Sequence, residues 1–144
     1  DVHELRDKFG FPSMKILQFG FDSKEGSPYV PHLFTPNSVV YTGTHDNDTI
    51  IGWYKKAPEE DKHYVREYMN TDAKDISWDF IRHAWMSVAV FALAPMQDML
   101  SLDSECRMNT PSVASGNWQW RFTWDQITPQ VKEKLLKLTK LYSR

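Results

Sequence analysis

The 144-residue sequence lacks the cysteine pairs, long apolar runs and basic clusters that characterise several classes of protein. It contains one cysteine, Cys106, so no disulfide can form within the chain, and this fits a reducing compartment. Its longest uninterrupted apolar run, residues 88–96, is far short of the roughly 20 residues that a membrane-spanning helix requires. The formal net charge is −2 and acids and bases are interspersed, so there is no basic field for nucleic acid and no polybasic face for a membrane. We therefore expect neither a nucleic-acid nor a membrane partner.

The sequence does contain enough apolar residues to bury a sizeable core, since 41% are hydrophobic and 14% are aromatic. No internal repeat and no linker divides it, so we expect residues 1–144 to form one unit without an internal domain boundary. Residues 1–8 read as the middle of a helix and lack the apolar stretch of a signal peptide. We therefore expect the chain to be a piece of a longer protein.

Polar residues follow one short strand-like run. Residues 38–42 are mainly β-branched and aromatic, they end at Gly43, and residues 44–49 are then all polar. This pattern predicts a strand that delivers a hydroxyl, an imidazole, carboxylates and an amide to one end of a sheet. In parallel α/β folds, catalytic groups gather at the carboxyl ends of the strands. His45 and Asp46 are therefore candidate functional residues, although His-Asp-Asn-Asp is also good chemistry for a simple turn with an Asx cap.

Two further segments are candidates for strands. Residues 14–19 are mainly apolar and lie between a proline and a glycine, which favours a buried strand. Residues 90–94 could extend a preceding helix or form a third strand, and periodicity does not decide between the two. Pro95 and the polar pair Gln97 and Asp98 favour a strand that ends in a second polar tip.

Helical signals lie between and after these strands. One helix is predicted to start with Pro58 at its first position and acids in its first turn. Another follows Asp75 as N-cap, with apolar residues at 3.6-residue spacing up to Val88, and a last helix opens with Thr128 as cap and Pro129. Three strands and at most three helices predict a parallel α/β arrangement that is too small for a closed barrel, which needs roughly 250 residues.

Six blocks of residues carry a resemblance to a known family. They are Leu17–Asp22, Pro31-His32, Asn37–Thr49, Pro95–Asp98, Arg107–Pro111 and Gly116–Trp118. In this order they resemble the 4-α-glucanotransferases, which are the amylomaltases or disproportionating enzymes of glycoside hydrolase family 77. The resemblance covers nearly the whole chain.

The resemblance implies an α/β fold that is the C-terminal part of a (β/α)8 TIM barrel. In this incomplete barrel, residues 14–19, 38–42 and 90–94 resemble the sixth, seventh and eighth strands. The implied activity is retaining transfer of α-1,4-glucan segments to a sugar 4-hydroxyl, through a covalent glycosyl-enzyme. The implied partners are an α-1,4-glucan or maltooligosaccharide donor and a sugar acceptor, with no cofactor and no metal. A bacterial cytoplasm or a plant plastid would suit such an enzyme.

The resemblance also implies roles for individual residues. Asp46 follows a histidine at the end of the presumed seventh strand, where the family has a third carboxylate, and is expected to stabilise the positive charge of the transition state. His45, Asn109, Phe19 and Asp22 are expected to contact substrate. The nucleophile and the general acid/base match no carboxylate here and are expected before residue 1. We therefore expect the isolated chain to be inactive.

Some polar and aromatic residues also fit structural roles. Asp48 is expected to be the N-cap of the helix that follows it, and Trp118 is expected to be structural. His32 is expected to be a solvated loop histidine.

Two other functions are compatible with parts of the sequence. A non-catalytic carbohydrate-binding module would fit the aromatic content and the missing acid pair. A metal-dependent phosphoesterase is a weaker alternative, because residues 43–48 resemble the Asn-His-Asp turn of two-metal enzymes, whereas the remaining histidines form no paired ligand motif.

Overall fold

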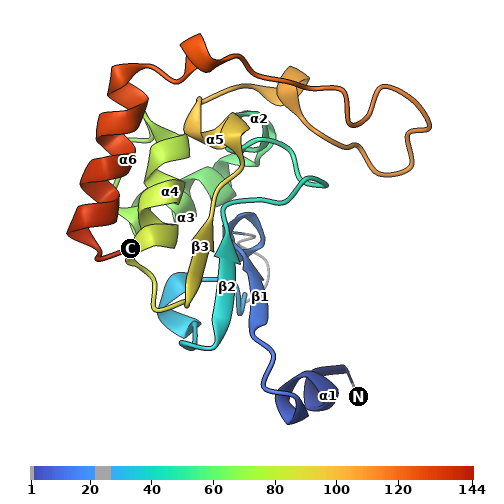
Figure 1. Cartoon of the computed structure of the whole chain (residues 1–144), viewed down its shortest axis with the longest axis vertical. Helices are drawn as coiled ribbons and strands as arrows, with labels where there is room; N and C mark the ends of the chain where they lie inside the picture. Colours follow the sequence, from blue (N-terminus) through green and yellow to red (C-terminus); the bar gives the residue numbers. More distant parts are fainter. Residues whose placement is uncertain (1, 22–26) are drawn as a thin grey trace.

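The computed structural model describes residues 2–21 and 27–144, and a parallel sheet lies at its centre (Figure 1). The strands lie in the order β1 (Ser13–Ile16), β2 (Ser38–Tyr41) and β3 (Phe91–Leu93). Parallel pairing brings the carboxyl ends of neighbouring strands to the same edge of a sheet. The segments that follow Ile16, Tyr41 and Leu93 therefore meet at one end of this sheet.

The described helices lie mostly to one side of the sheet. They are α1 (Val2–Lys8), α2 (Ile50–Lys56), α3 (Glu59–Met69), α4 (Ile76–Met86), α5 (Met96–Met99) and α6 (Pro129–Leu141). In Figure 1, α3 and α4 lie beside the strands and α6 is outermost, whereas α1 stands apart and has no buried residue. Within the described part of the chain, no helix is long and apolar enough to cross a membrane.

The core lies between the helices and one face of the sheet. Val40 of β2 and Phe80 and Ile81 of α4 are fully buried there. The rings of Phe21 and Phe80 pack edge to face, with their centroids 5.3 Å apart. Burial of such side chains is the main favourable contribution to folding.

The other face of the sheet is open. Side chains alternate between the two faces of a strand. Met14, Phe91 and Leu93 are accordingly exposed on the side away from α4, where they leave an apolar surface beside the carboxyl ends of the strands.

Several predicted elements are confirmed. The strands predicted at 38–42 and 90–94 are present as β2 and β3. Asp75 is the N-cap of α4, and Thr128 caps α6 by accepting a hydrogen bond from the backbone N–H of Val131, with Pro129 in the first turn.

Other predicted boundaries are wrong. The strand predicted at 14–19 ends at Ile16, and residues 17–21 form a 3-10 turn that buries Leu17 and Phe21. The helix expected to continue to Val88 ends at Met86, because Ser87 adopts an extended conformation that turns the chain towards β3.

The prediction of at most three helices is also wrong. Helix α2 is the next element after β2, and its N-cap is Thr49, whose hydroxyl accepts a hydrogen bond from the N–H of Gly52. Asp48, which was predicted to be this cap, lies one residue too early. Pro58 is the N-cap of α3 and not its first helical residue.

Candidate active site

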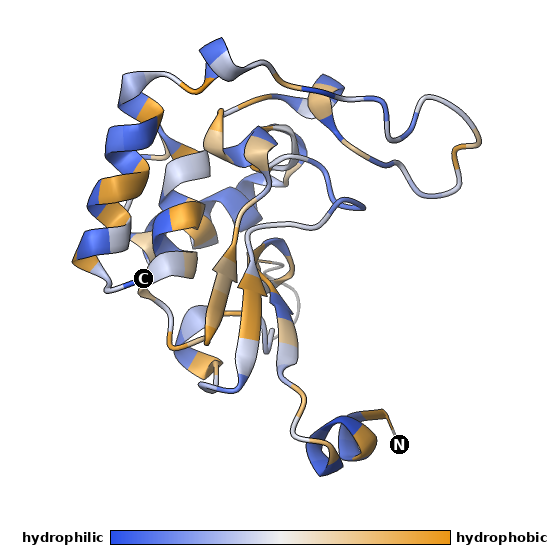
Figure 2. Cartoon of the chain, viewed as in Figure 1, coloured by the Kyte–Doolittle hydropathy of each residue, from blue (hydrophilic) through white to orange (hydrophobic). Residues whose placement is uncertain are grey.

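Residues 43–49 connect β2 to α2 and form the hydrophilic loop that stands out in Figure 2. Asn47 closes this loop, because its Oδ1 accepts hydrogen bonds from the backbone N–H and the hydroxyl of Thr44 at 2.9 and 2.7 Å. The turn chemistry expected from the sequence is therefore present, but Asn47 supplies it. The side chains of His45 and Asp46 point outward and are 55% and 51% exposed.

The carboxylate of Asp46 is held on one side by two neighbours. Asn109 donates a hydrogen bond from Nδ2 to Asp46 Oδ1 at 2.6 Å, and His45 Nε2 lies 3.4 Å from the same oxygen. The structure therefore brings together three residues that the sequence singled out, although Asn109 is 63 positions from Asp46.

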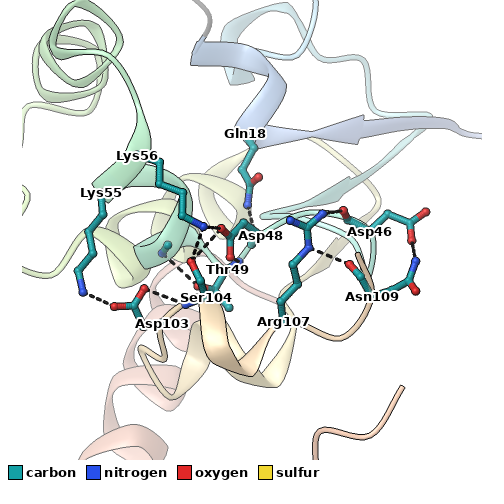
Figure 3. Close-up of polar contacts among 11 residues, drawn as sticks. Gln18, Asp46, Asp48, Thr49, Lys55, Lys56, Asp103, Ser104, Arg107 and Asn109 are labelled. Atoms are coloured by element: carbon teal, nitrogen blue, oxygen red, sulfur yellow. Dashed lines mark hydrogen bonds and ion pairs between the residues drawn. The ribbon is translucent and has the colours of Figure 1, made fainter. Parts of the chain in front are cut away.

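The backbone of His45 and Asp46 is held by Arg107 and Asn109. Figure 3 shows Arg107 and Asn109 beside Asp46. Arg107 donates from its guanidinium to the carbonyl oxygen of Asp46 and, through Nε, to that of Asn109 at 2.8 Å. The N–H of Asn109 donates to the carbonyl oxygen of His45 at 3.1 Å. Sequence reasoning assigned no role to Arg107, because nothing in the spacing of residues reports a contact across such a distance in the chain.

Trp118 packs against His45, with ring centroids 4.9 Å apart. Its φ is +64°, a left-handed conformation that is uncommon for a bulky residue, and its N–H donates to the carbonyl oxygen of Met108 at 2.8 Å. The ring is 53% exposed, so Trp118 covers one side of the imidazole and is no part of the core.

Two hollows flank the loop. The larger, of about 760 Å³, is bordered by Phe19, His45 and Asp46 and extends over the open face of the sheet. Phe19 presents its ring there and is 48% exposed. An aromatic surface with a few convergent polar groups is typical of a small-molecule site. Asp22, which was also expected to contact substrate, lies outside the described residues.

Asp48 belongs to a polar network beneath the loop (Figure 3). Its Oδ2 accepts hydrogen bonds from Lys56 Nζ at 2.6 Å and from Ser104 Oγ at 2.9 Å. Its carbonyl oxygen accepts a bond from Gln18 Nε2 at 2.7 Å. Asp48 thus joins the loop to α2, to the turn at Ser104 and to the end of β1.

The second hollow, of about 200 Å³, lies between His45, Trp118 and Asp98. Asp98 is 2% exposed, and burial raises the pKa of its carboxyl group to about 6. Hydrogen bonds from the Ile50 N–H and the Thr42 hydroxyl favour the charged form and oppose this shift, whereas nearby Asp48 adds to it.

Within 2–21 and 27–144, no group of three or more His, Cys, Asp or Glu side chains is close enough together to hold a metal ion.

His32, which was expected to be a solvated loop histidine, has its Nδ1 at 3.0 Å from the hydroxyl of Tyr68.

Comparisons with known proteins give consistent matches. The sequence model of glycoside hydrolase family 77, described as 4-alpha-glucanotransferase, matches residues 1–128. The chain is 47% identical to the 4-alpha-glucanotransferase of Synechocystis over 100% of its own length and 29% of that protein. It is 44% identical to the chloroplastic/amyloplastic 4-alpha-glucanotransferase of Oryza sativa, again over 100% of its own length but 25% of the relative's.

A solved structure matches as well. The amylomaltase of Streptococcus agalactiae, solved in complex with acarbose, superimposes with a TM-score of 0.95 at 36% identity and covers 99% of the chain. The chain spans 29% of that protein. The parallel sheet and its helices are thus part of a (β/α)8 barrel, as the family resemblance implied.

Proposed function

The chain belongs to the 4-alpha-glucanotransferases of glycoside hydrolase family 77, and we propose that it supplies part of the active site of an enzyme that transfers α-1,4-glucan segments to a sugar 4-hydroxyl. The observation that carries the proposal is the placement of Asp46. Its carboxylate lies at the carboxyl end of β2, beside His45 and Asn109, on the rim of the larger hollow. Phe19 lies on the same rim and offers a ring on which a sugar can stack.

In this proposal Asp46 stabilises the transition state. Glycosyl transfer with retention passes through an oxocarbenium-like state, in which positive charge grows on the sugar ring. A fixed carboxylate offsets that charge directly, and the hydrogen bonds that His45 makes with the sugar hydroxyls and that Asp46 accepts from them strengthen as the charge develops. Since the interaction is stronger in the transition state than in the ground state, its loss lowers kcat more than it raises KM.

The nucleophile and the acid/base are proposed to come from parts of the protein outside these 144 residues. Retaining enzymes use two carboxyl groups about 5 Å apart. We accordingly propose that residues 1–144 are one continuous portion of a catalytic barrel, without an internal domain boundary, and that they are inactive alone. The named relatives include bacterial and plastid proteins, so a bacterial cytoplasm or a plant plastid is the proposed location.

The test is Asp46→Asn in the full-length protein that contains this chain, assayed by disproportionation of maltotriose. We expect kcat to fall by roughly 10² to 10³, equivalent to about 2.7 to 4 kcal/mol, with little change in KM. Asp72→Asn is the matched control, because Asp72 is an exposed carboxylate that pairs with Lys74 on another part of the surface. A kcat for Asp46→Asn within about twofold of that of the control contradicts the proposed role.

One competing function predicts a different result in the same assay. A non-catalytic glucan-binding module would bind maltooligosaccharides and show no transfer in the full-length protein. Calorimetric binding without any disproportionation would therefore favour the module over the enzyme.

A further inference from the structure

One buried carboxylate contacts both ends of the loop 43–49. Thr42, the residue before the loop, donates a hydrogen bond from Oγ1 to Asp98 Oδ2 at 2.6 Å. Ile50, the residue after the loop, donates from its backbone N–H to Asp98 Oδ1 at 2.9 Å. Thr42 and Ile50 are both fully buried, and Asp98 is 2% exposed.

Asp98 is itself fixed to the core. It lies in α5, directly after β3, and its carbonyl oxygen accepts a hydrogen bond from Ser77 Oγ of α4 at 2.6 Å. Its N–H donates to the carbonyl oxygen of Pro95 at 3.0 Å. Asp98 therefore connects the residues that flank the loop to α4, through Ser77, and to the segment that follows β3, through Pro95.

The chemistry of the contact favours aspartate over an uncharged residue of the same shape. An ionised carboxylate has only acceptors, and here it meets two donors, a hydroxyl and an N–H. An amide in its place would have one acceptor and one NH₂ group, so one donor would lose its acceptor. A buried carboxylate is costly to keep, and its partners here both belong to the ends of the loop.

From this geometry we propose that Asp98 is a positioning residue, whose carboxylate fixes both ends of the loop 43–49 and thereby places His45 and Asp46 at the rim of the larger hollow. The inference rests on the proposed function, because it assigns Asp98 to the same reaction. Asp98 acts through the loop and touches no substrate. Misplacement of a reacting or charge-stabilising group by about 1 Å can cost roughly 10²-fold in rate.

The experiment compares Asp98→Asn with Asp79→Asn in the full-length protein. Asp79 is a matched control, since its Oδ2 also accepts a hydrogen bond from a threonine, Thr71, at 2.6 Å, but Asp79 lies on α4 and Thr71 is not part of the loop 43–49. We expect Asp98→Asn to lower kcat for maltotriose disproportionation by at least about tenfold with KM changed less than about threefold. We expect Asp79→Asn to leave both within about twofold.

Hydrogen exchange distinguishes a loop effect from general loss of structure. The peptide spanning residues 43–52 is expected to exchange at least about tenfold faster in Asp98→Asn than in wild type, while peptides of α4 and α6 stay unchanged. Unchanged exchange in 43–52, or a kcat within about twofold of wild type, overturns the proposal. If the wild-type protein shows no transfer at all, the proposed function fails, and the exchange comparison still decides whether Asp98 holds the loop.

A second pair of variants covers the case in which Asp98→Asn does not fold. Thr42→Val removes one of the two bonds to Asp98 and keeps the shape of the side chain, whereas Thr42→Ser keeps the hydroxyl. We expect kcat to fall in Thr42→Val and to recover to within about threefold of wild type in Thr42→Ser. Equal kcat in the two variants contradicts the role of the bond.

Discussion

Replacement of Asp98 by asparagine should change how the stability of the protein depends on pH. Burial raises the pKa of this carboxyl group from 3.8 to about 6. Between these two pH values the folded state binds the proton more strongly than the unfolded state does. Protonation of Asp98 therefore stabilises the folded state relative to the unfolded state. This stabilisation is fully present below about pH 3.8 and is lost as the pH rises through about 6.

The size of the effect follows from the two pKa values. The interval from 3.8 to about 6, at about 1.4 kcal/mol for each pH unit, corresponds to about 3 kcal/mol. Asp98→Asn carries no titrating group at this position. The free energy of unfolding of the variant, minus that of wild type, should therefore rise by about 3 kcal/mol between about pH 4 and about pH 7.

Urea unfolding of both proteins across this pH range measures the difference. Groups such as Glu59, Asp79 and His83, whose pKa values are also shifted, are present in both proteins and cancel. The charged or titratable groups near Asp98 are Asp48, together with His45 and Arg107 across the small hollow. A difference that stays constant within about 0.5 kcal/mol over the whole range would refute the reasoning, because it would show that the carboxylate titrates alike in both states.

Variants at three further positions test the packing and the contacts of the site. In Gly52→Ala the new Cβ would lie 2.1 Å from Ser104 Oγ, so we expect a loss of about 1 to 3 kcal/mol in urea unfolding. Phe80→Ala empties a fully buried position and should cost about 3 to 5 kcal/mol in the same measurement. Asn109→Asp places a second carboxylate against Asp46 and should lower kcat more than Asn109→Ala does. Equal kcat values in the two variants would show that a charge at position 109 does not affect the Asp46 carboxylate.

The sequence predicted those parts of the fold that local signals specify. The strand at 38–42 combines β-branched residues with a glycine stop, and the cap at Thr128 with Pro129 is a local pattern that is independent of the rest of the chain. The bounds of α2 were not predicted, because this helix is short and contains Gly52, which weakens the helical pattern. Asp48 was predicted to be the N-cap, whereas the N-cap is Thr49, the residue directly before Ile50.

The site was predicted in its residue types more than in its contacts. His45 and Asp46 were identified from their place after a strand. Asn109 was predicted only to contact substrate, and its bond to Asp46 was not predicted. The bond that Arg107 donates to the loop and the bonds that Asp98 accepts from Thr42 and Ile50 join positions about 50 to 60 residues apart, and such contacts form only when β2, α2 and α5 have packed. No spacing rule along the chain contains that information.

The attachment of Thr42 and Ile50 to one carboxylate also affects the entropy of the loop. An open segment loses roughly 1 to 2 kcal/mol per residue in conformational freedom when it becomes ordered. Because both ends of residues 43–49 are tied to Asp98, most of this freedom is lost when the chain folds and before any sugar binds. Under the proposed function, sugar binding then has little of the loop left to order, so a larger share of the binding free energy remains available to stabilise the transition state.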